Sequence, residues 1–421
     1  MASFSQDPGS AGASFSLRAR WVFPVSGPPL ENGVVEITDR RIRAIHDRSA
    51  PNAVDLGNAA VIPGLVNAHT HLELSNVATP LEPVEPFTTW LKAVIAHRRN
   101  RSITDAVARG REDSVRWGTT AIGDIAAADW SPVEGGSAGP RVVAFLECLG
   151  LAPERAAAQL DRARAHLAEN TAAHRGLSPH APYSVHPDLF RNLVDLAVQS
   201  RAPVAMHLAE TRAELELLAS GTGVLRPFLE ELGAWRPAAI PPGTRPLAYL
   251  RELARLDKAL VIHGNYLDDS EIDFIAGQAN ISVVYCPRTH AFFRHDPHPW
   301  RRLLARDVNV ALGTDSRASS PDLSLWNELL FLRRHAPEFD PVRLLRLGTW
   351  NGACALGLES EIGSLAPGKA ADLAIIDLAP GDATDPGALL FRPENRVGAV
   401  FVAGTCAAAA IHTQTASRGA R

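Results

Sequence analysis

The fold is decided by one stretch of the chain, Val-Ile-Pro-Gly-Leu-Val-Asn-Ala-His-Thr-His-Leu-Glu-Leu-Ser at residues 61–75. Its apolar run predicts a buried strand over 61–66. The run leads to His69 and His71, and on an extended chain this spacing points both side chains to the same side. The stretch therefore predicts a strand that brings two imidazoles together, either as metal ligands or as two core histidines.

Length and charge restrict the class of protein. The chain has 421 residues, of which 46% are hydrophobic, and a formal net charge of -4. Such a chain can bury one large core with a smaller core attached, or form two domains of medium size. The acidic balance argues against nucleic acid or an anionic membrane as the main partner, so a small-molecule substrate is expected.

The cysteines and the N-terminal residues indicate where in the cell the protein is expected to lie. The four cysteines are widely separated and form no Cys-x-x-Cys pair, which predicts neither a disulfide framework nor a thiolate zinc cluster. No long apolar run predicts a membrane span, and the first residues lack the pattern of a signal peptide. We expect a cytoplasmic protein, with flexible tails over 1–14 and 412–421.

Both ends of the sequence are rich in short strands. Near the N-terminus, Leu17–Phe23, Val34–Thr38 and Ile42–His46 are separated by turn signals, and a similar texture returns after residue 360. Neither end has enough apolar strands to be stable alone. We therefore assign 15–60 together with 361–411 to one composite β-sandwich domain.

The middle of the chain, 61–360, alternates between strand and helix, which is typical of a parallel sheet. Ser102 with Asp105 predicts one helix start and Gly118 its end, while Ser320-Pro321 predicts the start of another helix. We count eight strands: 61–66, 119–124, 142–146, 176–179, 204–208, 260–264, 281–285 and 310–313. Eight strands favour an α/β fold of the (β/α)8 barrel type, and an open doubly wound sheet is the alternative.

Polar residues follow several of these strands at the point where each strand ends. His207 and Glu210 follow the fifth, His263 the sixth and Asp315 the eighth. Each alone has an ordinary explanation as a solvated pair, a buried imidazole or a turn residue. A closed barrel would bring all of them to the carboxyl ends of its strands, where barrel enzymes keep their active sites.

These motifs together resemble the amidohydrolase superfamily, in particular its cytosine, guanine and methylthioadenosine or adenosylhomocysteine deaminase branch. The resemblance covers residues 17–403, including Gly-Leu-Val-Asn-Ala-His-Thr-His at 64–71 and Pro-Gly-Lys-Ala-Ala-Asp-Leu at 367–373. It implies a distorted barrel with a small β-sandwich formed from both chain ends. It further implies one divalent ion, Zn²⁺ or Fe²⁺, with His69, His71, His207 and Asp315 as ligands. The implied catalytic residues are Glu210, His263 and Asp315. Glu210 would be the proton shuttle, and His263 would position the attacking water or the tetrahedral intermediate.

The residue types agree with that chemistry. Three neutral imidazoles and one carboxylate suit Zn²⁺ or Fe²⁺ and leave a position open for water. The fourth strand and its following loop, 176–184, contain no lysine that could bridge two metals. We therefore predict a mononuclear site that performs hydrolytic deamination with release of ammonia.

Substrate contacts are predicted from several segments. His180 lies in a His-Ala-Pro-Tyr motif of nucleoside deaminases, and Arg288 could bind an anionic group. A proline-rich loop after 79 and a second loop over 220–246 are expected to cover the site. The predicted substrate-binding residues are His180, Arg288, Glu82, Glu85, Glu147, Trp90 and His290.

The combined motifs look most like aminodeoxyfutalosine deaminases, which act on an adenine nucleoside in menaquinone synthesis. Methylthioadenosine or adenosylhomocysteine deamination is the next alternative, followed by removal of amine or chloride from triazine-like rings. A non-catalytic scaffold of the same superfamily is a remote alternative, because such members usually lack metal ligands. Relatives are often dimers, so a homodimer is expected as well.

Overall fold

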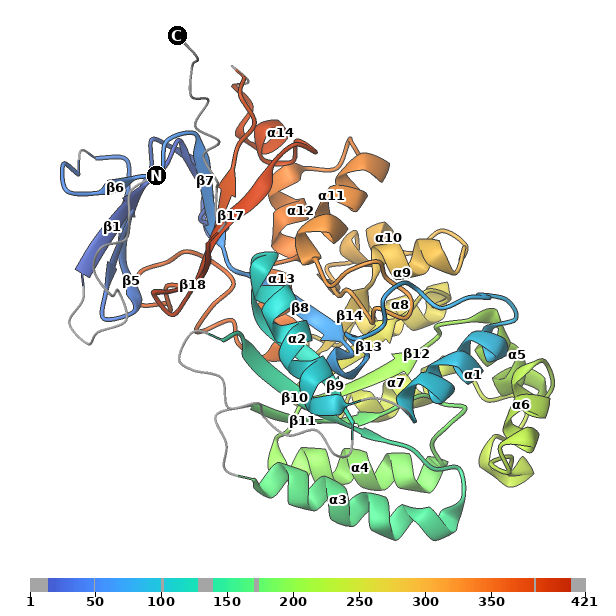
Figure 1. The fold of residues 1–421 in the computed structure, drawn as a ribbon. Coiled ribbons are helices and arrows are strands. Elements are labelled where there is room, and N and C mark those ends of the chain that lie inside the picture. Colours follow the sequence, from blue (N-terminus) through green and yellow to red (C-terminus); the bar gives the residue numbers. More distant parts are fainter. Residues whose placement is uncertain are drawn as a thin grey trace.

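The computed structural model describes residues 14–48, 50–99, 102–127, 139–169, 174–381 and 384–409. The predicted tails lie outside these residues, except Ser14, which begins the first strand. The chain forms a central barrel with helices around it and two β-sheets beside it that are built from both chain ends (Figure 1).

The barrel consists of eight parallel strands hydrogen-bonded in sequence order from β8 to β15. The first and last strands are joined where the backbone N–H groups of Thr314 and Asp315 both donate to the carbonyl of His69, at 3.1 Å. The predicted (β/α)8 barrel is therefore confirmed, and the open sheet is excluded. Its strands are β8 (Leu65–Thr70), β9 (Thr119–Ala126), β10 (Arg141–Cys148), β11 (His174–Pro179), β12 (Val204–Leu208), β13 (Ala259–His263), β14 (Ile281–Tyr285) and β15 (Asn309–Leu312).

The predicted first strand, 61–66, is wrong in its bounds. The apolar run is divided between β7 (Ala59–Pro63), which belongs to an outer sheet, and β8, which belongs to the barrel. Gly64 lies at the break, and a Cβ there would come within 2.2 Å of Thr120 Oγ1. Only glycine lets the chain pass this close to the neighbouring strand as it moves from one sheet to the other. The other seven strands lie within two residues of their predicted bounds.

Two sheets are built from the chain ends. A four-stranded sheet has the order β5-β4-β1-β6, and a six-stranded sheet has the order β18-β17-β16-β7-β2-β3. The predicted strand Leu17–Phe23 is divided between these two sheets. Their strands are β1 (Ser14–Arg18), β2 (Trp21–Val22), β3 (Leu30–Glu31), β4 (Val34–Thr38), β5 (Arg41–His46), β6 (Val54–Asp55), β16 (Leu373–Asp377), β17 (Arg396–Val402) and β18 (Thr405–Ala409).

Helix starts follow the local sequence, with one correction. Ser102 caps α2 (Ile103–Arg116) by accepting the backbone N–H of Asp105, as predicted. The helix expected after Ser320-Pro321 begins later, because Ser324 rather than Ser320 caps α11 (Leu325–His335). The remaining helices are α1 (Phe87–Arg98), α3 (Ala156–Ala168), α4 (Pro187–Ser200), α5 (Arg212–Ser220), α6 (Leu225–Glu231), α7 (Pro246–Leu253), α8 (Asp269–Ala276), α9 (Pro287–Phe292), α10 (Trp300–Leu304), α12 (Pro341–Leu347), α13 (Trp350–Leu356) and α14 (Pro386–Leu390).

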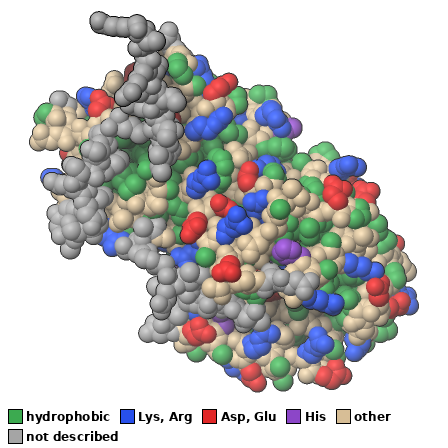
Figure 2. Space-filling view, in the orientation of Figure 1, with side chains coloured by type: hydrophobic (Ala, Val, Ile, Leu, Met, Phe, Trp, Pro, Cys, Tyr) green, Lys and Arg blue, Asp and Glu red, His purple; other side chains and the backbone are tan. Residues whose placement is uncertain are grey.

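The surface carries charges of both signs. On the face shown in Figure 2, Lys and Arg side chains alternate with Asp and Glu side chains over the barrel helices. Within the described ranges, no helix is long and apolar enough to cross a lipid bilayer.

Candidate metal centre and active site

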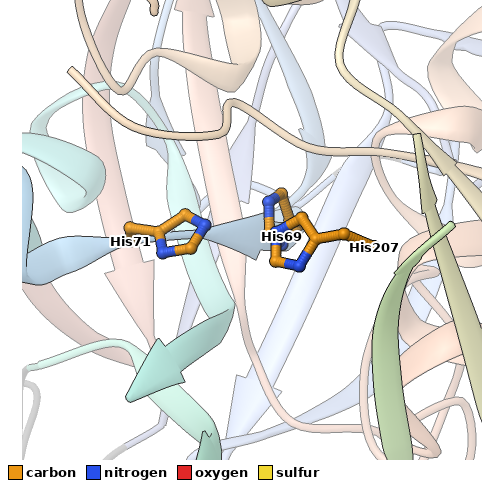
Figure 3. A group of neighbouring side chains, drawn as sticks. All are labelled: His69, His71 and His207. Atoms are coloured by element: carbon orange, nitrogen blue, oxygen red, sulfur yellow. The ribbon is translucent and has the colours of Figure 1, made fainter. Parts of the chain in front are cut away.

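Three histidines meet at the carboxyl ends of two barrel strands. His69 and His71 come from the end of β8 and His207 from β12, and one nitrogen of each lies within 4.8 Å of the others. The ring centroids of His69 and His207 are 5.0 Å apart, and those of His71 and His207 are 5.4 Å apart. In Figure 3 the imidazole of His71 lies beside those of His69 and His207, which overlap in this view.

The nitrogens of these rings fit a metal ion. Both ring nitrogens of His69 and Nδ1 of His71 are buried without a hydrogen-bond partner among the residues that the structure describes. Nδ1 of His207 donates to the carbonyl of His180 at 3.0 Å, which leaves its Nε2 for the centre. Burial lowers the pKa of His71 to about 3 and the pKa of His207 well below its usual value. Neutral imidazoles with unpaired nitrogens are the form that binds Zn²⁺ or Fe²⁺.

Asp315 adds one carboxylate to the same group. Its Oδ1 lies 3.6 Å from His69 Nε2 and 3.7 Å from His71 Nε2. Its Oδ2 accepts a hydrogen bond from Ser319 Oγ at 2.8 Å, which fixes the orientation of the carboxylate. Burial raises the pKa of Asp315, but His69, whose Nε2 lies 3.6 Å away, and the other nearby histidines outweigh burial and hold this pKa below its usual value, so Asp315 is ionised. The donor set is thus three nitrogens and one oxygen.

Glu210 and His263 lie beside this donor set. The Oε1 of Glu210 is 3.5 Å from His263 Nε2, and both side chains are buried. Burial, together with the charges of Asp315 and Glu214, raises the pKa of Glu210 well above its usual value. A carboxyl group in this environment can hold a proton near neutral pH and pass it on.

Backbone strain accompanies these residues. Ala209, His263 and Asp315 have φ of 54°, 68° and 55°, in the left-handed region that residues other than glycine rarely adopt. Glu214 supports the first of these turns, because its two carboxylate oxygens accept the backbone N–H groups of Ala209 and Glu210, both at 2.9 Å. Such local strain is commonly found at functional sites.

A cavity of about 480 Å³ opens above the histidines. Its inner end contains polar side chains, and its walls are largely apolar and come from α1, from the segment after β10 and from α6. This size and composition are typical of small-molecule sites. The lining residues are His71, Leu74, Phe87, Trp90, Leu91, Val94, Ile95, Arg98, Leu149, Gly150, Leu151, Ala152, Glu154, Arg155, His180, Tyr183, Ser184, His207, Glu210, Phe228, Leu229, Leu232, Gly233, Ala234, Arg236, His263, Asp315 and Ser316.

Some predicted substrate residues lie at this cavity. His180 and Trp90 line it, and part of the predicted second cover, 220–246, lines it through α6 and the segment that follows. The indole N–H of Trp90 donates to the carbonyl of Ala318 at 3.1 Å, which attaches α1 to the segment after Asp315. Glu147 lies behind the wall, with its Oε1 4.0 Å from His180 Nε2.

Arg98 lines the cavity, although the sequence analysis did not predict it as a site residue. Its guanidinium contacts Glu73 Oε1 at 2.6 Å and Glu147 Oε2 at 3.2 Å. Burial raises the pKa of Glu147, but the charge of Arg98 outweighs it and lowers that pKa to about 2. No sequence motif contains Arg98. It lies at the end of α1, and only the folding of the barrel brings Glu73 and Glu147 next to it.

Four of the predicted substrate residues lie elsewhere. Arg288 was expected to bind an anionic group, but its guanidinium is paired with Glu328 and Asp322, both at 2.6 Å. His290 bonds the carbonyl of Asp296 through Nε2 at 2.8 Å and is not part of the cavity wall. Glu82 and Glu85 are exposed on the loop before α1 and do not line the cavity.

The chain is similar to known proteins in sequence and in fold. A model of the amidohydrolase family matches residues 60–407. The chain belongs to the amidohydrolase family. The predicted resemblance is thereby confirmed.

Two curated relatives of this family member illustrate the range of named activities. An aminodeoxyfutalosine deaminase of Deinococcus radiodurans is 30% identical over 356 residues, covering 79% of this chain and 83% of the relative. A 5-methylthioadenosine/S-adenosylhomocysteine deaminase of Moorella thermoacetica is 28% identical over 381 residues, covering 85% of this chain and 84% of the relative.

Solved structures have the same fold as this amidohydrolase. An adenosine deaminase of Xanthomonas campestris with bound zinc is 26% identical, with a TM-score of 0.75 and coverage of 93% of this chain and 92% of the other. The aminofutalosine deaminase of Helicobacter pylori, solved with methylthio-coformycin, is 23% identical and has a TM-score of 0.78, with coverage of 93% and 99%. The second likeness concerns the fold alone.

Proposed function

We propose that this amidohydrolase is a metal-dependent hydrolytic deaminase that removes the amino group from an adenine nucleoside. The observation that carries the proposal is the position of Glu210, a buried carboxyl group of raised pKa beside His263 and the three converging imidazoles. The names of the curated relatives support the substrate class, since they are adenine-nucleoside deaminases.

One divalent ion, Zn²⁺ or alternatively Fe²⁺, would be held by His69, His71, His207 and Asp315. When bound, such an ion activates water for attack at neutral pH. The ionised Asp315 would balance part of its charge, and the histidines would donate ring-nitrogen lone pairs to it. The zinc bound by the Xanthomonas relative favours Zn²⁺.

The chain itself supplies proton transfer and positioning. Glu210 takes a proton from the attacking water and delivers it to the ring nitrogen next to the amino-bearing carbon, which makes that carbon more electrophilic. His263 keeps the attacking oxygen beside Glu210, because its Nε2 lies 3.5 Å from Glu210 Oε1. Glu210 then takes a second proton from the hydroxyl that has added to the ring carbon and passes it to the amino group, so that the C–N bond breaks and ammonia leaves.

Aminodeoxyfutalosine is the substrate that we favour. Its aromatic arm would fit the apolar wall made by Phe87, Trp90 and Phe228, and its carboxylate would reach Arg155 and Arg236 at the outer part of the cavity. In this proposal Arg155 and Arg236 bind the anionic group that was expected to bind Arg288. The Deinococcus relative named for this substrate is 30% identical, as is a relative from Nitratidesulfovibrio vulgaris named for the second candidate, so the choice rests on the cavity wall.

Methylthioadenosine or adenosylhomocysteine is the second candidate, because the Moorella relative and several others carry that name. The triazine hydrolases share the fold at 20% identity or less and add no argument about the substrate. A non-catalytic scaffold is disfavoured, because a scaffold has no need to bury Glu210 and His263 beside a complete donor set.

The test is ammonia release from the zinc-reconstituted protein with aminodeoxyfutalosine, methylthioadenosine, adenosylhomocysteine, adenosine, guanine and cytosine at equal concentration. We expect a kcat/KM of about 10⁴ M⁻¹s⁻¹ or more for one adenine nucleoside. The Glu210→Gln variant is the control for contaminating activity. Release from guanine or cytosine alone would overturn the nucleoside assignment.

A further inference from the structure

His298 is a buried histidine outside the cavity that the proposed chemistry does not use. It lies between α9 and α10, and only 9% of its surface is exposed. Its Nε2 donates a hydrogen bond to the backbone carbonyl of His263 at 2.7 Å. His298 thus contacts the backbone of an active-site residue from a separate segment of the chain.

The protonation state of His298 follows from its surroundings. Burial lowers the pKa of His298 to about 3, so the ring is neutral and carries a single ring proton. Because a carbonyl oxygen can only accept, that proton is on Nε2. Nδ1 is buried without a hydrogen-bond partner among the described residues. The ring is also stacked on Tyr285, with centroids 3.9 Å apart and planes 17° from parallel.

The backbone that His298 holds is strained. His263 has φ of 68° and the next residue, Gly264, has φ of 61°. A left-handed residue other than glycine is strained and persists only where its surroundings fix it. From the β12 side, the carbonyl of Leu208 accepts the N–H of Gly264 at 3.1 Å. The bond from His298 restrains the same turn from the β14 side.

We propose that His298 is a positioning residue: its bond to the His263 carbonyl fixes the left-handed turn that directs the His263 imidazole at Glu210. Packing alone does not require this bond, because the stack on Tyr285 would bury the ring in either tautomer. The neighbouring histidines have other partners, since His290 bonds Asp296 and His295 Nδ1 lies 3.1 Å from the hydroxyl of Tyr266.

Two substitutions separate the hydrogen bond from the packing. His298→Phe keeps an aromatic ring against Tyr285 but removes the donor. His298→Gln loses the ring but places an amide N–H near the position of Nε2. We expect the phenylalanine variant to lower kcat about 10- to 100-fold with KM changed less than about twofold, because small misplacements of a catalytic group have effects of this size. The glutamine variant should recover most of kcat.

The double variant with His263→Ala tests whether His298 acts through His263. In that background, His298→Phe should lower kcat no further, since the residue that it positions is gone. A full, independent loss in the His263→Ala background, or equal losses in the phenylalanine and glutamine variants, would overturn the proposal. If His298→Phe does not fold, His298→Met serves as the variant without a donor.

The rate measurements rest on the proposed function, so a second readout is independent of it. Hydrogen exchange of the backbone amides over 263–266 should be faster in His298→Phe than in wild type and unchanged in His298→Gln. Equal exchange in wild type and His298→Phe would overturn the positioning role. Absence of deaminase activity in the wild type would instead refute the proposed function and leave the exchange result to decide the role of His298.

Discussion

The ends of β12 and β14 share a sequence pattern, a buried strand followed by a charged residue, but the charged side chains point to different places in the structure. Each buried strand is followed by charged residues, Glu210 after β12 and Arg288 after β14, and both were predicted to lie in the site. Glu210 lines the cavity, whereas Arg288 is paired with Glu328 on α11.

The difference comes from the element that follows each strand. After β12, the turn at Ala209 stays at the barrel mouth and is held there by the carboxylate of Glu214. After β14, helix α9 begins at Pro287, so Arg288 already belongs to a helix and its direction is set by the packing of α9 against α11. Glu210, in the first turn after its strand, could therefore be placed from sequence, whereas Arg288, on the following helix, could not.

The largest effect is expected at the end of β12. Glu210→Gln should lower kcat by about 10²–10⁴-fold, because it removes proton transfer. Zinc content, measured by mass spectrometry, should stay at the wild-type level, since Glu210 is not one of the proposed ligands. Asp315→Asn is the matched variant and should lower both zinc content and turnover. Equal zinc loss in the two variants would contradict the roles given to them.

Arg98 and Arg288 can be compared in their contribution to stability, because the guanidinium of each is paired with two carboxylates. Replacing either arginine by methionine leaves buried carboxylates unpaired, which should lower the free energy of unfolding by about 3–5 kcal/mol. Urea denaturation measures this. The control is Lys92→Met, which removes an exposed ion pair with Glu231 and should cost less than about 1 kcal/mol. Similar costs for all three variants would contradict the buried pairing.

Glu214, which supports the turn after β12, is expected to make the stability of the protein depend on pH. Burial raises the pKa of Glu214 from 4.5 to about 7 in the folded protein. Between these values the folded protein holds a proton that the unfolded chain releases, so this group's contribution to stability falls as pH rises from 4.5 to 7. Denaturation midpoints at several pH values in that window should fall more steeply for wild type than for Glu214→Gln. Parallel slopes would show that Glu214 does not titrate there.

The smallest effect concerns the far end of the substrate. Arg155→Ala should raise KM for aminodeoxyfutalosine about tenfold relative to adenosine, because it removes a hydrogen bond to a charged group. Arg288→Met should leave this ratio of KM values unchanged, since its guanidinium is bonded to Glu328 and Asp322. A selective rise in the Arg288 variant would instead restore its predicted role in substrate binding.

The sequence alone determined the barrel and the convergence of its polar residues. Alternation along a strand has a period of two, and parallel strands end at one edge, so His69, His71, His207 and Asp315 could be placed together from local patterns. The division of 61–66 between two sheets was not visible in that pattern, because both halves are apolar and only contact with Thr120 shows why Gly64 breaks the run.

Only the tertiary structure decided which other side chains reach the cavity. Arg98 and Arg288 lie on helices, and His298 lies in a connecting segment, so their directions depend on packing between elements distant in sequence. The sequence predicts the residue types in such elements, but the rotation of a helix about its axis is set by what it packs against. For this reason the donor set could be predicted from the sequence, whereas the cavity wall and the support of His263 could not.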